Sequence, residues 1–217
     1  MSGEGLLTEE RLMIRGVARE FTMKEVLPVA NELDPVQGAI PLELRDKLAD
    51  MGYFGIRIPE QYGGSGLGCF EYCLVAEQLA RGWMSVASII ARGNGTLTID
   101  LLSDEQKSRV LPRVVTGEYL GAMSLSEPDT GSDLASMSCR AVRDGDDWVI
   151  TGNKYWCTFA DGADYIVLFA RTSTSDDPAR RHVGISAFII DKPRGQFPDG
   201  VHGSPIPKIG YFGWKTW

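Results

Sequence analysis

Apolar side chains in the first half of the chain recur at the spacing of an α-helix. Ile14, Val17, Ala18 and Phe21 fall on one face at intervals of three and four residues. Thr8 is expected to start this helix, because its hydroxyl can accept hydrogen bonds from free backbone N–H groups at a helix N-terminus. The N-terminal region is therefore predicted to open with an amphipathic helix.

Three further helices are predicted before residue 119. One begins at Pro41 and ends at Gly52, and the next spans about residues 69–80. The last opens at Ser103, whose spacing to Gln106 is that of a capping box, and Pro112 lies in it or near its end. The side chains expected to face inward are Leu44, Leu48 and Met51 in the first helix, and Cys69, Tyr72, Cys73, Ala76, Leu79 and Ala80 in the second.

The hydrophobic period changes to that of β-structure near residue 119. Residues 138–143 and 147–151 flank Asp144-Gly145, which is typical of a hairpin because both residues tolerate positive φ. Further strands are predicted over residues 153–158, 165–170 and 184–190, with a polar surface loop over residues 173–181. Helices followed by strands indicate an α+β protein. We expect an all-helical domain over residues 1–119 and an antiparallel, barrel-like or stacked-sheet middle domain over residues 120–217.

Composition and charge exclude several classes of protein. With 43% hydrophobic and 24% charged residues the chain resembles an ordered globular protein, not a disordered one. A net charge of -7 without a basic cluster argues against nucleic-acid binding. The apolar runs are too short to span a membrane, and residues 1–10 do not resemble a signal peptide, so we expect a cytoplasmic protein. Four cysteines and two distant histidines predict neither a disulfide framework nor a metal site.

Three segments are candidates for chemistry. Residues 59–66 (PEQYGGSG) form a glycine-rich connection, residues 123–133 (MSLSEPDTGSD) place hydroxyls and backbone donors after a strand, and residues 154–158 (KYWCT) carry Trp156 and Thr158. If residues 154–158 form a strand, these two side chains share a face. Each segment alone has a structural explanation, as turn glycines, a turn cap and a core aromatic.

The order and spacing of these segments are similar to those of the acyl-CoA dehydrogenase family, and the resemblance covers nearly the whole chain. The family's Pro-Glu-x-Tyr-Gly-Gly-x-Gly segment matches residues 59–66, and its Glu-Gln-Lys helix with the following Leu-Pro and Gly-Glu matches residues 105–118. The Thr-Glu-Pro-x-x-Gly-Ser-Asp loop matches residues 126–133, with Ser126 for threonine. The Lys-x-Trp-Ile-Thr-Asn segment matches residues 154–159, with Cys157 for isoleucine and Phe159 for asparagine.

The resemblance implies a flavoprotein with FAD as its cofactor. The loop is expected to border the isoalloxazine, with backbone donors near Leu125 and the Ser126 hydroxyl directed at its polar edge. Trp156 would lie against the other side of the ring, Thr158 would donate toward the reactive edge, and the Cys157 side chain would face away. Ser132 matches a position that contacts the acyl-CoA. The expected cofactor-binding residues are Met123, Ser124, Leu125, Ser126, Ser132, Trp156, Cys157 and Thr158.

The implied reaction is α,β-dehydrogenation of an acyl-CoA thioester in acyl-CoA metabolism, with hydride transfer to flavin N5. The family's catalytic base is a glutamate in a C-terminal helical domain that we expect to be missing from this chain, so no catalytic residue is assigned; Glu127 is expected to be structural. The resemblance also implies an electron-transfer flavoprotein as electron acceptor and a homotetramer. Alternatives are an acyl-CoA oxidase, a desulfinase-like enzyme, or a non-catalytic subunit of a hetero-oligomer.

Arg92 is a candidate for substrate specificity. It follows an apolar run, residues 86–91, in the region that family members place near the acyl pocket. A cation there can pair with the carboxylate of a dicarboxylic acyl-CoA, since a buried charge needs a partner. The alternative is that Arg92 neutralises the negative end of its own helix or pairs with a surface acid.

Overall fold

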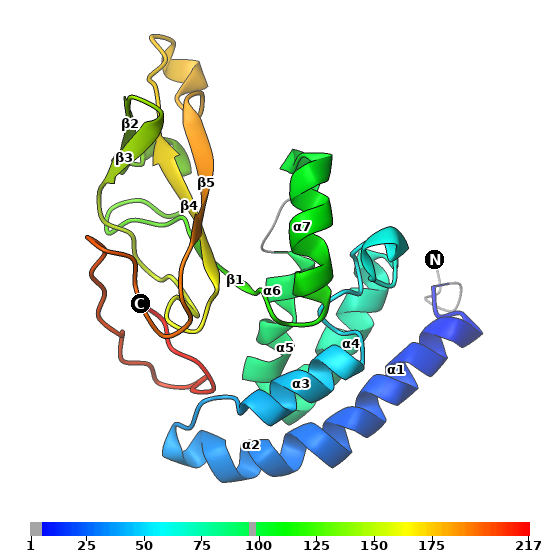
Figure 1. The fold of residues 1–217 in the computed structure, drawn as a ribbon. Helices are drawn as coiled ribbons and strands as arrows, with labels where there is room; N and C mark the ends of the chain where they lie inside the picture. Colours follow the sequence, from blue (N-terminus) through cyan, green and yellow to red (C-terminus); the bar gives the residue numbers. More distant parts are fainter. Residues whose placement is uncertain (1–5, 96–98) are drawn as a thin grey trace. The chain divides into compact units, whose positions relative to one another are not determined.

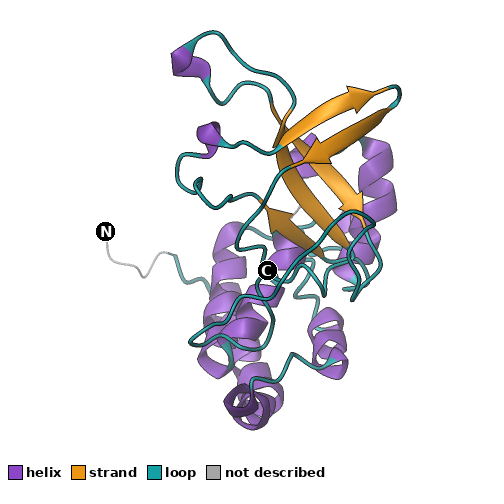
Figure 2. Ribbon diagram, turned by 90° about the vertical axis from the view of Figure 1, so that its left-hand side faces the viewer, coloured by secondary structure: helices purple, strands orange, loops and turns teal. Residues whose placement is uncertain are grey.

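The computed structural model of the chain describes residues 6–95 and 99–217. The first five residues of the N-terminal segment used above to expect no signal peptide lie outside these ranges. The chain divides into two compact units (Figures 1 and 2). The helical unit comprises Met1–Leu120 and Lys208–Trp214, and the sheet unit comprises Gly121–Pro207 and Lys215–Trp217.

The helical unit is built from seven described α-helices. They are α1 (Glu9–Phe21), α2 (Leu27–Leu33), α3 (Leu42–Asp50), α4 (Cys69–Gly82), α5 (Met84–Ile89), α6 (Ala91–Asn94) and α7 (Asp104–Val115). A π-helical turn, Thr22–Val26, joins α1 to α2, so that the two follow each other in a nearly continuous rod (Figure 1). The core of the helical unit consists of large side chains that are almost fully buried, among them Leu48, Phe54, Ile58, Leu79, Ile90 and Leu111.

The predicted helix starts are confirmed at two positions. The Thr8 hydroxyl accepts a hydrogen bond from the Arg11 backbone N at 3.3 Å, and Ser103 and Gln106 form the expected capping box at the start of α7. Pro41 is the residue before α3 and not its first helical residue. Pro112 lies inside α7, so the last turn of that helix continues past it.

The inward face of α4 differs from the predicted one. Its buried residues are Glu71, Leu74, Val75, Gln78 and Leu79, whereas Cys69 and Cys73 are exposed. Only Leu79 belongs to both the expected and the observed face among the fully buried positions. The prediction was wrong because two inward positions are polar, so that counting apolar residues rotated the expected stripe. On α1, Ala18 and Phe21 are buried as predicted, but Val17 is exposed.

The sheet unit contains a mixed five-stranded sheet among the described residues. Its strands are β1 (Gly121–Ser124), β2 (Arg140–Asp144), β3 (Asp147–Thr151), β4 (Tyr165–Arg171) and β5 (Ile185–Asp191). They pair in the order β1-β4-β2-β3, and β5 also pairs with β4. The predicted hairpin is present: β2 and β3 are antiparallel and Gly145 in the turn between them has φ 61°.

The α+β class is confirmed, but the sheet is not purely antiparallel. The β1 strand runs parallel to β4, with Gly121 opposite Tyr165, and β2 meets β4 in parallel at Arg140 and Arg171. Two parallel neighbouring strands need a long connection that brings the chain back to the end of the sheet where the first strand began. The segment between β1 and β4, which contains the hairpin, is this connection. Among the five described strands, the antiparallel pairs are β2–β3 and β4–β5.

Residues 208–214 lie with the helices, although the predicted boundary assigns everything after residue 119 to the middle domain. The Gly213 backbone N donates to the Ser85 hydroxyl at 3.1 Å, and the Ile40 backbone N donates to the Gly213 carbonyl at 2.8 Å. Trp214 is buried in the same unit. Over residues 6–95 and 99–217, no helix is long and apolar enough to cross a membrane.

Candidate functional site

The loop after β1 and the segment after β3 lie side by side in the sheet unit. The Lys154 Nζ donates to the Leu125 carbonyl at 3.1 Å and to Glu127 Oε1 at 2.9 Å. The Tyr155 backbone N donates to the Ser126 carbonyl at 2.8 Å. The two motif segments that the sequence pointed to are therefore joined by side-chain and backbone hydrogen bonds.

Glu127 anchors the loop from inside the unit. Its carboxylate is buried and accepts hydrogen bonds from the Ser138 backbone N and hydroxyl, from the Cys139 backbone N and from Lys154. Burial alone would raise the pKa of Glu127, but the hydrogen bonds from Ser138, Lys154 and Cys139 outweigh it and lower the pKa to about 2. A carboxylate held in this way is a structural anchor and is not poised to accept a proton near neutral pH.

The segment from Asn153 to Cys157 is not a strand, in contrast to the prediction. Trp156 has φ 63°, in the left-handed region that β-structure does not use. The alternation of a strand therefore does not place Trp156 and Thr158 on a common face. The indole is 57% exposed and packs edge-to-face on the Tyr155 ring, with centroids 4.6 Å apart.

The end of the segment pairs with the last residues of the chain. Cys157 and Trp217 exchange backbone hydrogen bonds of 2.8 and 3.1 Å, and the Phe159 backbone N donates to the Lys215 carbonyl at 2.8 Å. The Thr158 and Thr216 hydroxyls are 3.3 Å apart, in hydrogen-bond contact. The pairing fixes the backbone on either side of Thr158 and keeps this residue half-buried.

The candidate cofactor residues differ in exposure. Ser124 and Cys157 are buried and line a partly open cavity of about 350 Å³ in the sheet unit, so their side chains are directed inward. Trp156 is exposed, and the remaining candidates in these two segments are half-buried: Met123, Leu125, Ser126 and Thr158. An exposed indole, apolar side chains and two hydroxyls suit a planar aromatic ligand with a polar edge, which is the character of an isoalloxazine.

Ser132 is exposed in the same loop, next to a surface ion pair. Arg181 makes hydrogen bonds of 3.1 and 3.2 Å to the two carboxylate oxygens of Asp133, which also accepts a hydrogen bond from the Ser136 hydroxyl at 2.6 Å. The Ser136 bond and the Arg181 guanidinium lower the pKa of Asp133. These contacts connect the Ser132 loop to the loop before β5.

Arg92 belongs to the helical unit and is half-buried in the short helix α6. Its guanidinium lies over the Trp214 ring, 4.8 Å from the ring centroid, in a cation–π contact. The guanidinium is therefore partly removed from solvent by an aromatic ring.

Several residues that build this site carried no signal of their role in the sequence. The buried ion pair of Lys154 with Glu127 and the pairing of Thr158 with Thr216 join residues that are far apart in the chain. Lys154 was visible only as the first residue of its motif. Nothing in the polar loop of residues 123–133 distinguishes Glu127 as the partner of Lys154.

Comparison with known proteins matches both halves of the chain. Residues 8–118 match the family model of the acyl-CoA dehydrogenase N-terminal domain, and residues 122–216 match that of the middle domain. The chain is 38% identical to (2S)-methylsuccinyl-CoA dehydrogenase of Cereibacter sphaeroides over 99% of its own length and 40% of the relative's. It is 37% identical to mitochondrial isovaleryl-CoA dehydrogenase of Pongo abelii, over 97% and 49%.

A solved structure has a similar fold. A glutaryl-CoA dehydrogenase from Mycobacterium smegmatis, in complex with FADH2, matches with a TM-score of 0.83 and 28% identity, over 99% of this chain and 53% of that chain. The chain thus spans about half the length of the proteins that it matches.

Proposed function

The chain belongs to the acyl-CoA dehydrogenase family, and on this premise we propose that the protein catalyses FAD-dependent α,β-dehydrogenation of an acyl-CoA thioester. The single observation that carries the proposal is the join between the two motif segments. The Lys154–Glu127 ion pair and the Tyr155–Ser126 backbone hydrogen bond hold the loop that carries Ser126 against the segment that carries the exposed Trp156. A purely structural protein has no need for an exposed tryptophan with a left-handed backbone conformation beside such a loop.

The residues of the sheet unit divide the work of holding the flavin. Backbone donors near Leu125 and the Ser126 hydroxyl would hold the polar edge of a bound flavin, Trp156 would cover one side of the ring system, and Thr158 would donate toward the reactive edge. Bound FAD supplies the acceptor that takes the β-hydrogen of the substrate as a hydride at N5. The protein's part is to place the ring and to tune its electronics by hydrogen bonds. Met123 completes the apolar surface, whereas Ser124 and Cys157 act through their backbone because their side chains point inward.

The reaction also needs a base for the α-proton and hydrogen bonds to the thioester carbonyl, which stabilise the developing enolate. No residue of this chain is assigned as the base. Glu127, the carboxylate within the motif, is engaged by Ser138, Cys139 and Lys154 and has a pKa of about 2. Glu127 therefore holds the loop, and the α-proton is accepted by a group other than Glu127.

The substrate is bound in part by Ser132, which contacts the pantetheine–phosphate part of the acyl-CoA from its exposed loop. Arg92 selects for a second carboxylate on the acyl chain. This part of the proposal is supported by the names of two relatives, a methylsuccinyl-CoA and a glutaryl-CoA dehydrogenase. An isovaleryl-CoA dehydrogenase among the relatives supports a monocarboxylic substrate instead.

The electrons then pass to an electron-transfer flavoprotein, and the protein works as a homotetramer; both statements extend the family resemblance to this protein. An acyl-CoA oxidase shares the same flavin-binding segments and differs in passing its electrons to oxygen. Comparing reoxidation of the reduced protein by oxygen and by an electron-transfer flavoprotein separates these two functions.

The test uses Trp156→Ala and Thr158→Ala in the full-length protein. Both variants are expected to retain less flavin or to be reduced more slowly by acyl-CoA than the unaltered protein. Trp148→Ala is the matched control, because Trp148 is also exposed in the sheet unit and packs edge-to-face on an aromatic ring, that of Phe188. Full flavin content and unchanged reduction in both site variants would refute the assignment.

A further inference from the structure

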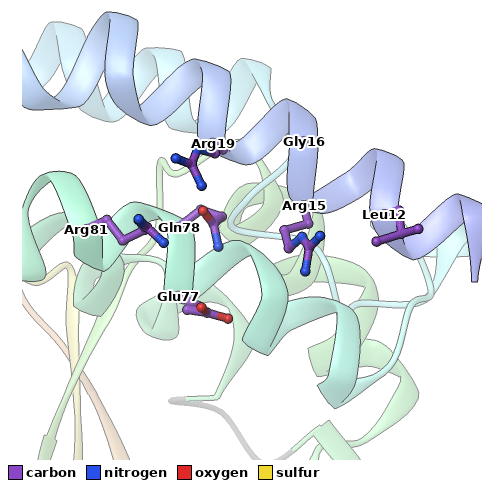
Figure 3. A pocket seen from close by; sticks show the side chains of 7 residues that line it. All are labelled: Leu12, Arg15, Gly16, Arg19, Glu77, Gln78 and Arg81. Carbon is purple, nitrogen blue, oxygen red and sulfur yellow. The ribbon is translucent and has the colours of Figure 1, made fainter. Parts of the chain in front are cut away.

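A second pocket lies between α1 and α4 in the helical unit, and no step of the proposed reaction uses it. Its volume is about 350 Å³, within the range typical of small-ligand sites. Arg15 and Arg19 project from α1 toward α4, and Arg81 projects from α4 into the same space (Figure 3). Since Arg15 and Arg19 are four residues apart, they lie on one face of α1.

The charge in this pocket is unbalanced. Among the described residues, none of the three arginines makes a side-chain hydrogen bond or an ion pair, and Glu77 is the pocket's single carboxylate. One turn earlier the charges on α1 and α4 do neutralise each other, because Arg11 of α1 forms an ion pair of 2.6 Å with Glu71 of α4. The pocket therefore concentrates positive charge that the described residues of the chain leave uncompensated.

Two further residues of the pocket are a glycine on α1 and a buried glutamine on α4. A Cβ atom added at Gly16 would meet nothing within 4 Å, so the α1 side of the pocket is open. Gln78 is 3% exposed, and its Oε1 has no hydrogen-bond partner. Buried side-chain amides are normally hydrogen-bonded, so this oxygen requires a donor that the described residues do not supply.

We infer that this pocket binds a phosphate group. Arginine guanidinium groups match the oxygens of phosphate in a bidentate geometry, and three of them around one centre outweigh the charge of Glu77. The same chemistry is offered by inorganic phosphate and by the phosphate of a small ester such as a nucleoside monophosphate.

The test is calorimetric titration of the full-length protein with inorganic phosphate at constant ionic strength. Saturable binding at one site per chain is expected, and Arg19→Gln and Arg81→Gln should each weaken it by about tenfold or more, since each removes charge-assisted hydrogen bonds. Gly16→Glu should abolish binding, because its carboxylate would occupy the arginines. This variant should fold at least as well, since glutamate is a better helix former than glycine.

The control is Arg109→Gln, which removes an exposed arginine from α7 and should leave the affinity unchanged. Absence of saturable phosphate binding to the unaltered protein would overturn the inference. So would an equal loss in Arg109→Gln, or unchanged affinity in a folded Gly16→Glu variant. Titration with adenosine monophosphate identifies the source: equal affinity assigns recognition to the phosphate alone, and tighter binding assigns it to an ester, both in agreement with the inference.

Discussion

Replacing Lys154 by methionine should destabilise the sheet unit strongly, because it leaves the buried Glu127 carboxylate without its counter-ion. Nζ of Lys154 would be lost as a donor to Glu127 at 2.9 Å and to the Leu125 carbonyl at 3.1 Å. Removing one partner of a buried ion pair typically costs about 3–5 kcal/mol. Since Glu127 keeps its donors from Ser138 and Cys139, we expect the lower end, about 3 kcal/mol.

The lowered pKa of Glu127 gives an energy of the same order. A shift from 4.5 to about 2 corresponds to about 3 kcal/mol of stabilisation of the charged form. Because the folded pKa lies below the unfolded one, this stabilisation is fully present above about pH 4.5 and is lost as the pH falls toward 2. Glu127→Gln should therefore flatten the acid limb of the stability profile in this pH window.

The assay is thermal unfolding, followed by circular dichroism. For a chain of this length, about 3 kcal/mol lowers the midpoint by about 6–12 °C. Lys47→Met is the matched control, because Lys47 pairs with Glu43 and Glu25 in a more exposed setting and should change the midpoint little. An unchanged midpoint in Lys154→Met would refute the reasoning. So would strict additivity in the Lys154→Met/Glu127→Gln double variant, since residues in contact should couple.

Two other changes are open to direct measurement. Ser103→Ala removes the hydroxyl that accepts from the Gln106 backbone N at 3.2 Å and should lower the free energy of unfolding by about 1 kcal/mol in urea denaturation; no change would mean that α7 does not depend on this cap. Arg92→Leu should lower kcat/KM for a dicarboxylic acyl-CoA by about tenfold or more relative to a straight-chain monocarboxylic one. An equal change on both substrates would remove Arg92 from substrate selection.

Local signals predicted much of the fold. The cap at Thr8, the capping box at Ser103 and the hairpin around Gly145 depend on residues close together in the chain, and all three are present. The buried face of α4 could not be predicted by the same means. Glu71 and Gln78 face inward there, and Glu71 is accommodated by an ion pair with Arg11 that comes from another helix.

The sequence predicted which residues belong to the candidate site but not the backbone conformation that they adopt. The sequence marked Ser126 and Trp156 as members of two separate motifs, but it carried no sign that Trp156 adopts a left-handed backbone. The residues that follow Trp156 pair with partners distant in the chain, such as Thr216, which contacts Thr158 across 58 residues. Strand propensity depends on neighbours along the chain, so it assigned a β-strand to residues 153–158. In the structure, Tyr155 bonds to the loop after β1, whereas Cys157 bonds to Trp217.

Anaerobic titration of the purified full-length protein with an acyl-CoA, followed by its visible flavin absorbance, tests the proposed function most directly. The account predicts that the protein contains flavin, that the absorbance is bleached on mixing, and that an α,β-unsaturated acyl-CoA forms in equal amount. A protein that purifies with flavin that no acyl-CoA reduces, or that binds no flavin at all, would contradict it.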